Sequence, residues 1–584
     1  MGSKDSRSES VGPEYRLDGG TGVMMRKGVF LREATGLVRE MNAFDVLAMN
    51  SFNISAGLGL AFVLFYGPSL FYNANIPVGV LLATLGGLCG ALTFALLTAM
   101  VPRSVGDYVL VTRTLHPALG FATNWTWHFW NIAWAGILTS FVSNWALYQL
   151  FAIYGTLYDV PSYRDIAFNP EAANFAVTPG TIFPVAWTLF PQNSILNILI
   201  GTIIIAAFGV MLSVGPKVFL YFQRAVFTIG IVSLVVTLGI MLMATRQTFV
   251  DNWNTYATTW QTNPAQYADV EARAGGATSY ANIIATIAII PLASWSLAYG
   301  NVTTAVGGEI KRPTRNLPLG ASLSVLMAGG IMAIGGLFFI NVVGLDFISG
   351  SVNSYNAYYY GGETTGPWYF FYPAPFFDLW VSIVAPHPAI TLLVGIGFIC
   401  WIIYYPGLNI LVNTRAVLAW SFDRVAPSAL GKVSEKYHTP IRAVVLYTCL
   451  SWVALVIFSM FFTLVGSLTP VLATFLTMFL VMGIVGLVFP FTRKTKPIYQ
   501  ASGARWRVGP VPVLTIVSIG WLLFLFTGAY FYLTEGYLAS NNPTMLTISA
   551  VVFFAAFPLY YLAKFYRQSR GVDIALAFKE IPPE

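Results

Sequence analysis

Residues 50–59 read Asn-Ser-Phe-Asn-Ile-Ser-Ala-Gly-Leu-Gly and stand in the middle of the first long apolar run of the chain. Six of these ten residues are Asn, Ser or Gly. Glycine weakens a helix, and Ser and Asn side chains offer the backbone competing hydrogen bonds. A break frees backbone N–H and C=O groups, which are tolerated at membrane depth only where they line a cavity. The stretch therefore predicts a broken membrane helix beside a cavity.

The composition of the whole chain agrees with a membrane environment. Hydrophobic residues make up 56% of the sequence and charged residues 9%, whereas a soluble protein is about 25% charged. Apolar runs long enough to cross a ~30 Å hydrocarbon core recur along the chain. We expect an all-α polytopic membrane protein with about 12 transmembrane helices. The expected spans are 45–67, 76–101, 118–155, 193–214, 217–244, 280–307, 319–345, 389–422, 441–463, 466–491, 512–533 and 545–563.

Two of these spans, 118–155 and 389–422, are longer than one crossing needs. We interpret them as long helices that run past the membrane surface, each with room for a short extra segment.

The distribution of basic residues gives the expected orientation. Of the 31 Lys and Arg residues, 28 lie in the two tails and in one alternating set of loops, and 3 lie in the opposite set. Acidic residues divide more evenly, 14 to 10. Because Lys and Arg accumulate on the cytoplasmic side, we expect both tails, 1–44 and 564–584, to be cytoplasmic. This bias explains the basic charge without a nucleic-acid partner.

Three loops expected outside the membrane are long: 156–192, 245–279 and 346–388. They are rich in Tyr, Asn, Pro and Trp. An aromatic belt at the lipid headgroups explains this composition, and a lid over an external vestibule is the alternative.

A second polar cluster lies in the sixth span. It combines Pro291, which removes a helical donor, with residues 294–304, where Gly300 precedes Asn301. The sixth span comes five crossings after the first, and because five is odd the two spans run in opposite directions. Interrupted helices in corresponding positions of two inverted halves point to a transport site. Close helix packing through small residues is the alternative interpretation of either cluster.

Three sets of motifs make the sequence recognisable. The first is the small-residue break at residues 55–59. The second is residues 297–300, Leu-Ala-Tyr-Gly, followed at 308–318 by Gly-Glu-Ile-Lys-Arg-Pro-Thr-Arg-Asn-Leu-Pro. The third is residues 413–416, Asn-Thr-Arg-Ala, with Asp-Arg-Val-Ala-Pro at 423–427 and His-Thr-Pro at 438–440. Together they resemble the amino acid–polyamine–organocation (APC) superfamily of permeases, most clearly over helices 1 to 10.

The resemblance implies a LeuT-like fold and alternating-access secondary transport, most often of amino acids. Its implied organisation is a 5+5 inverted repeat, at 45–244 and 280–491, around an extracellular loop at 245–279. Two peripheral helices follow at 512–563.

Helix breaks also suit a zwitterion physically, because N–H groups at a half-helix start attract a carboxylate and the carbonyls ending the other half attract an ammonium group. We expect the carboxylate at Ser55, Ala56 and Gly57. The residues expected near the ammonium group or around the side chain are Asn53, Leu297, Ala298, Tyr299, Gly300 and Asn301.

Candidate gate and coupling residues lie nearer the cytoplasmic side. Basic residues there are expected to set the topology, and the resemblance allows Lys311 or Arg415 a second role in an inner gate with Glu309 or Asp423. His128 lies roughly 15 Å into the third span at 1.5 Å per residue. It is expected to bond to a neighbouring helix, with a proton relay as the alternative.

Sodium coupling is doubtful on the sequence. In sodium-coupled relatives, helix 8 supplies hydroxyl ligands to an ion held against helix 1, but residues 392–413 contain no Ser or Thr. In some proton-coupled relatives a lysine in helix 5 takes the place of the ion, and residues 225–244 contain no lysine. The equivalent position falls near Ile229 or Gly230. Sodium-independent exchange, facilitated transport and proton coupling through another group stay open.

We therefore expect a plasma-membrane permease for amino acids or related small amines, without a cofactor or metal. A polyamine or other organic cation permease and a transporter-like sensor without flux are the alternatives. An enzyme is not expected, because a catalytic constellation is missing from the sequence. The four histidines lie apart, and Cys89, Cys400 and Cys449 fall in apolar spans without metal-ligand spacing.

Overall fold

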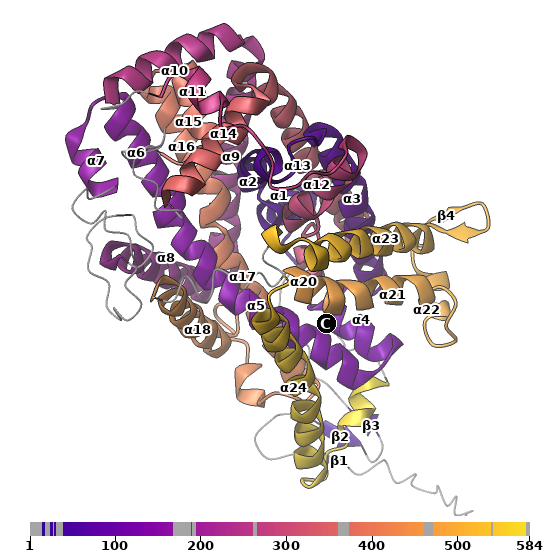
Figure 1. The fold of residues 1–584 in the computed structure, drawn as a ribbon. Coiled ribbons are helices and arrows are strands. Elements are labelled where there is room, and N and C mark those ends of the chain that lie inside the picture. Colours follow the sequence, from indigo (N-terminus) through magenta and orange to yellow (C-terminus); the bar gives the residue numbers. More distant parts are fainter. Residues whose placement is uncertain are drawn as a thin grey trace, which may run out of the picture.

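The computed structural model describes residues 39–167, 189, 194–260, 265–359, 373–460, 471–538 and 541–579, together with three short strands near the N-terminus. Among the described residues, 12 helical spans are long and apolar enough to cross a membrane. They agree with the expected spans (Figure 1). The expected span 466–491 is described from residue 471.

The first half of the chain contains five spans. The first is α1 (Ala43–Ile54) with α2 (Ala56–Leu70), and the second is α3 (Ile76–Met100). The third joins α5 (Pro117–Phe141), a π-helical turn η1 (Val142–Leu147) and α6 (Tyr148–Leu157). The fourth and fifth are α8 (Ile195–Val214) and α9 (Pro216–Met243). The third span is thus one long helix with an internal bulge, which agrees with the expected long helix.

The second half begins with α12 (Asn282–Leu297), which leads into the 3-10 turns η3 (Val302–Ala305) and η4 (Gly307–Glu309). The seventh span is α13 (Pro313–Val343), and the eighth is α16 (Pro388–Ile403) with α17 (Tyr405–Phe422). The ninth is α18 (Ile441–Met460), and the tenth joins α20 (Val471–Thr474), η6 (Phe475–Phe479) and α21 (Leu480–Val488). The last two are α23 (Val513–Thr534) and α24 (Pro543–Gln568).

The connections carry structure that the sequence analysis did not anticipate. One set consists of α7 (Pro161–Ala167), α10 (Arg246–Trp260), α11 (Tyr267–Glu271), α14 (Leu345–Tyr359) and α15 (Phe377–Val384). Another consists of α4 (Gly106–Thr114), η5 (Ser428–Leu430), α22 (Lys496–Ala501), the hairpin β4 (Arg507–Val508) and β5 (Val511–Pro512), η7 (Gly536–Leu538) and η8 (Ile574–Phe578). The N-terminal strands β1 (Tyr15–Leu17), β2 (Met24–Arg26) and β3 (Val29–Phe30) pair antiparallel.

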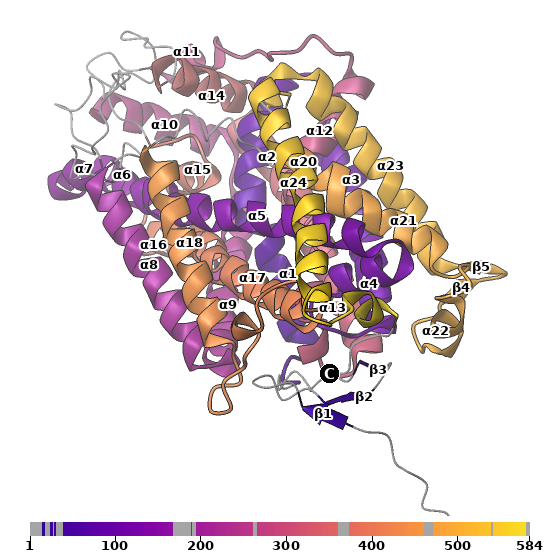
Figure 2. The ribbon, with the colours of Figure 1, turned by 90° about the horizontal axis from the view of Figure 1, so that it is seen from below.

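Figure 2 shows the two ends of the bundle. Helices α10, α11 and α14 lie at one end, which we call the loop end, and β1–β3 and the C-terminus lie at the other, which we call the terminal end. The N-terminal strands and the last described residues thus lie at the same end, as an even number of crossings requires.

Burial separates a central group of spans from a peripheral one. In the first span 89% of the apolar window is buried inside the protein, compared with 28% in the fourth and 11% in the twelfth. Helix α1 packs against α13, α12 packs against α3, and α5 packs against α17. A span buried on all sides must satisfy its polar groups inside the protein, so the polar breaks in the first and sixth spans face protein rather than lipid.

Candidate functional site

The break in the first span occurs at Ser55. This residue has φ 52° in the left-handed region, which costs a non-glycine residue about 1–3 kcal/mol. Its N–H donates to the carbonyl of Ser51 at 2.7 Å, and its hydroxyl donates to the carbonyl of Trp401 at 2.8 Å. The first bond closes the last turn of α1, and the second holds the break against the eighth span.

The break in the sixth span follows Leu297. Helix α12 passes through Pro291 and ends at Leu297, and Asn301 then leads into the 3-10 turn η3. The break therefore falls at the Gly300–Asn301 weak point rather than at the proline. Gly300 has no room for a side chain, since an added Cβ would lie 2.5 Å from Cγ2 of Val325.

Hydrogen bonds join the two breaks directly. The Asn53 side chain donates to the carbonyl of Tyr299 at 2.7 Å. One turn earlier, the Asn50 side chain donates to the Thr303 hydroxyl at 3.1 Å and accepts from the Thr303 N–H at 3.2 Å. Backbone groups released by one broken helix are thus satisfied by side chains of the other.

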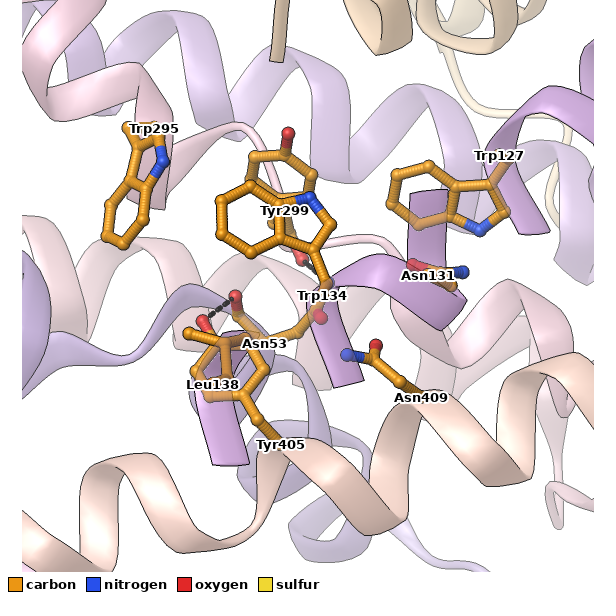
Figure 3. Close-up of a pocket in the computed structure, with 9 residues that line it drawn as sticks. All are labelled: Asn53, Trp127, Asn131, Trp134, Leu138, Trp295, Tyr299, Tyr405 and Asn409. Carbon is orange, nitrogen blue, oxygen red and sulfur yellow. Dashed lines mark hydrogen bonds between the residues drawn. The ribbon is translucent and has the colours of Figure 1, made fainter. Parts of the chain in front are cut away.

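A cavity with about 390 Å³ of empty space lies where the two breaks meet α5 and α17 (Figure 3). The residues that line it are Asn53, Trp127, Asn131, Trp134, Leu138, Trp295, Tyr299, Tyr405 and Asn409. Three tryptophans and two tyrosines form most of its wall, and none of these lining residues is charged.

Polar atoms converge on this cavity from three spans. The Tyr405 hydroxyl donates to the carbonyl of Asn53 at 2.6 Å. The side-chain amide nitrogens of Asn131 and Asn409 have no hydrogen-bond partner among the described residues. Figure 3 shows these two side chains, one from α5 and one from α17, on the same wall of the cavity. Both are donors positioned for an acceptor group of a ligand.

The structure places two of the expected substrate residues, Asn53 and Tyr299, on the cavity wall. The other expected residues lie in the same two breaks but not among the lining residues: Ser55, Ala56, Gly57, Leu297, Ala298, Gly300 and Asn301. The N–H of Ser55 already donates to Ser51, so it is not available to a carboxylate.

The lining residues of α5 and α17 were not predicted from the sequence. On α5 the members are Trp127, Asn131, Trp134 and Leu138, spaced by four, three and four residues. This spacing places them on one helix face. This spacing of polar and aromatic residues was the feature of the sequence from which the lining face of α5 could have been predicted. That this face lies opposite the helix breaks is seen only in the tertiary structure.

Trp401 occupies the space between the first, fifth and eighth spans. Its side chain is fully buried, and its indole N–H donates to the carbonyl of Gly230 at 3.2 Å. A Cβ added to Gly57 would lie 2.5 Å from Cδ1 of Trp401. Glycine at position 57 is therefore required by close packing on an indole ring.

Two buried ion pairs lie on the terminal-end side of the cavity. Arg415 Nε and Nη2 bond to the two carboxylate oxygens of Glu309 at 2.7 and 3.1 Å. Arg113 bonds to both oxygens of Asp423 at 2.9 and 3.0 Å. Of the expected gate residues, Glu309 thus pairs with Arg415, and Asp423 pairs with Arg113. The Lys311 side chain is exposed, while its N–H donates to the carbonyl of Met41 at 2.9 Å.

His128 lies in α5 and is buried. Its Nδ1 is 2.6 Å from Oδ1 of Asn413 on α17, as expected for a histidine bonded to a neighbouring helix. His128 does not line the cavity, but Asn131, one helical turn away, does.

Comparison with known proteins gives the family. The sequence profile of the amino acid permeases matches residues 43–557, which include all twelve spans except the end of the last. A comparison with curated proteins finds no match. Among the residues that the structure describes, no group of three or more His, Cys, Asp and Glu side chains is placed to hold a metal ion. The chain belongs to the amino acid permease family of the APC superfamily and is a multi-pass membrane transport protein.

Proposed function

We propose that this protein is a secondary transporter that carries an amino acid or a related small amine across the plasma membrane by alternating access. The observation that carries the proposal is the cavity at the meeting of two broken helices, because discontinuous helices place unpaired backbone groups and dipole ends at a substrate. The tails and one alternating set of loops hold 28 of the 31 basic residues, which supports a cytoplasmic location for the terminal end of the bundle. The opposed breaks support the inverted repeats 45–244 and 280–491.

The cavity chemistry favours a zwitterion with an apolar or aromatic side chain. Its uncharged lining supplies no counter-ion, so backbone dipoles must balance the charges of the substrate. The amides of Ala56 and Gly57 are the proposed carboxylate contacts. The side-chain amides of Asn131 and Asn409 are proposed donors to a further acceptor of the substrate.

A specific observation favours a second candidate. Five aromatic side chains line the cavity, and aromatic faces bind ammonium groups by cation–π interactions. An organic cation without a carboxylate is therefore the alternative substrate class.

The two buried ion pairs support an inner gate. They tie η4 and α4 to α17, and the carbonyl of Glu309 also accepts from the N–H groups of Glu40 and Met41 at 3.0 and 3.1 Å. This arrangement joins the segment before the first span to the loop after the sixth. We propose that this end is closed in the present arrangement and opens when the pairs part.

Trp401 supports sodium-independent transport. In the sodium-coupled relatives discussed above, an ion lies between helix 1 and helix 8. Here an indole ring packs on Gly57 of helix 1 and bonds to Gly230 of helix 5.

Transport by purified protein in liposomes tests this proposal. Liposomes are loaded with the unlabelled standard amino acids, and uptake of each tritium-labelled amino acid, and of labelled spermidine, is measured with and without sodium. We expect exchange of at least one amino acid without sodium. Asn131→Leu should reduce it strongly, whereas Asn541→Leu, in the loop before α24, should not. If neither an amino acid nor spermidine is taken up or exchanged, the proposed function is wrong.

A further inference from the structure

A line of buried polar side chains follows the contact between α5 and α17, from the central cavity toward the terminal end. We call it the α5–α17 seam. Its members are Asn131, His128 and Asn124 on α5 and Asn409, Asn413 and Trp420 on α17. The α5 members are spaced by three and four residues and the α17 members by four and seven, so each set lies on one helix face. Every member is at most 5% exposed.

Hydrogen bonds connect the terminal-end part of the seam to a buried carboxylate. The Trp420 indole N–H donates to Oδ1 of Asn124 at 2.8 Å, and the Asn124 amide donates to Oδ2 of Asp107 at 2.6 Å. His128 packs edge-on against Trp420, with ring centres 5.8 Å apart. The line therefore reaches from a cavity residue, Asn131, to Asp107 on α4.

The middle of the seam contains polar atoms without partners. An amide oxygen only accepts, so the Nδ1–H of His128 donates to Asn413, and Nε2 of the ring carries a free lone pair. Nε2 of His128 and the amide nitrogens of Asn131, Asn409 and Asn413 have no partner within the described part of the chain. Each such group costs about 1–3 kcal/mol when buried unpaired. Clusters of this kind inside a membrane protein mark ion and proton pathways.

We propose that the α5–α17 seam carries a proton between the central cavity and the terminal end, with His128 and Asp107 as the two groups that bind it. The proposal rests on the transport function proposed above and assigns its coupling ion. The proton enters through the cavity and forms an N–H bond at Nε2 of His128. When the terminal end opens and admits water, this bond breaks, the water carries the proton to a carboxylate oxygen of Asp107, and Asp107 releases it to the cytoplasm. Substrate and proton move in the same direction.

The surroundings of Asp107 suit proton release. Asp107 is 3% exposed and lies outside the membrane spans, and burial raises its pKa to about 6 although the bond from Asn124 opposes this shift. The ionisable groups on elements packed against α4 and α5 include Tyr108 and Arg113 on α4, Cys89 on α3, Arg415 and Asp423 at α17, Tyr447 on α18 and Tyr560 on α24. Of these groups, Arg113 is paired with Asp423, and Arg415 is paired with Glu309. Helices α18 and α24 also carry Arg442, Lys564 and Arg567. The causes of the raised pKa of Asp107 do not include an ion pair, so no fixed cation keeps this carboxyl group in its charged form.

The test separates proton coupling from transport itself. Purified protein is placed in phosphatidylcholine–phosphatidylglycerol liposomes, and the probe is a mixture of tritium-labelled standard amino acids. Exchange is measured at equal pH on both sides, and accumulation is measured with an inward proton gradient. A gradient of about one pH unit supports about tenfold accumulation at one proton per substrate, because each such unit is worth about 1.4 kcal/mol.

We expect the wild type to exchange the probe and to accumulate it about tenfold under this gradient. His128→Gln and Asp107→Asn should retain exchange and lose accumulation. The matched controls, His387→Gln and Asp251→Asn, lie at the loop end and should retain both activities. Accumulation by either seam variant at the wild-type level would overturn the proposal. If the wild type exchanges the probe but shows no proton-driven accumulation, the proton proposal is wrong and the proposed transport function stands. If no transport of any kind is measured, both are wrong.

Asn413→Asp provides a second measurement in case His128→Gln does not fold. A carboxylate beside the ring stabilises the imidazolium form. The pH midpoint of proton-driven accumulation should therefore move about 1 unit or more toward alkaline pH. A shifted midpoint supports the proposal even if His128→Gln is inactive in both assays. An unshifted midpoint together with that inactivity would overturn it.

Discussion

Glu309→Gln should open the terminal end of the protein. In the structure the Arg415 guanidinium bonds to both oxygens of Glu309, at 2.7 and 3.1 Å, and the two side chains are 1% and 6% exposed. Glutamine keeps one acceptor oxygen but removes the negative charge, so Arg415 is left as a buried and uncompensated cation. Removing one partner of a buried pair costs about 3–5 kcal/mol. We use about 3 kcal/mol because one acceptor is kept, which corresponds to a shift of about 150-fold toward arrangements in which Arg415 reaches water.

The labelling rate of a cysteine at position 411 measures this shift. Leu411 is 6% exposed and lines a second cavity, with about 330 Å³ of empty space, together with Glu309. In a background with the native cysteines replaced, Leu411→Cys should react with a water-soluble maleimide at least tenfold faster, as an order of magnitude, when Glu309→Gln is added. Glu435→Gln, an exposed acid-to-amide change, is the matched control.

Adding Arg415→Met to Glu309→Gln should return most of the original slow labelling, because the unpaired charge is then gone. Equal labelling rates with and without Glu309→Gln, in protein that remains folded, would refute the gate. Fast labelling that persists in the double variant would refute the explanation by an unpaired charge.

Three further predictions concern packing, pH and the joined breaks. Gly57→Ala should destabilise the purified protein by about 1–3 kcal/mol, because the added methyl group overlaps Trp401. In a thermal unfolding assay, adding Trp401→Leu should recover part of that loss. Equal stability of the wild type and Gly57→Ala would contradict this packing. Burial raises the pKa of Asp378 from 3.8 to about 7, so its folded form holds a proton that the unfolded chain releases, and stability should fall as pH rises from about 4 to about 7. This fall should be smaller in Asp378→Asn when melting temperatures are compared across that window, and parallel profiles would show that the carboxyl group is not the cause. Asn50→Ala and Thr303→Ala should each cost about 1–3 kcal/mol, and their combined cost should be less than additive; strict additivity would mean that the two side chains do not act as a pair.

Part of the candidate site followed from sequence. Residues 50–59 and 294–304 predicted two helix breaks, and the structure places one at Ser55 and the other after Leu297. Asn53 and Tyr299 were expected at the substrate site, and both line the cavity. Glu309, Arg415 and Asp423 were also predicted from the sequence as gate candidates. Arg113 was not predicted as the partner of Asp423, because 310 residues separate the two in the chain.

The sequence by itself determined the number of spans and the positions of the two helix breaks. It also predicted the orientation of the spans. These properties depend on local composition: apolar length, the placement of Lys and Arg, and the weak helix propensity of Gly, Ser and Asn. Only the tertiary structure decided which helix faces meet. It brought the aromatic face of α5 and Tyr405 and Asn409 of α17 to the two breaks. It also placed Trp401 against Gly57. Such contacts depend on how helices far apart in sequence cross and pack, which no local pattern specifies.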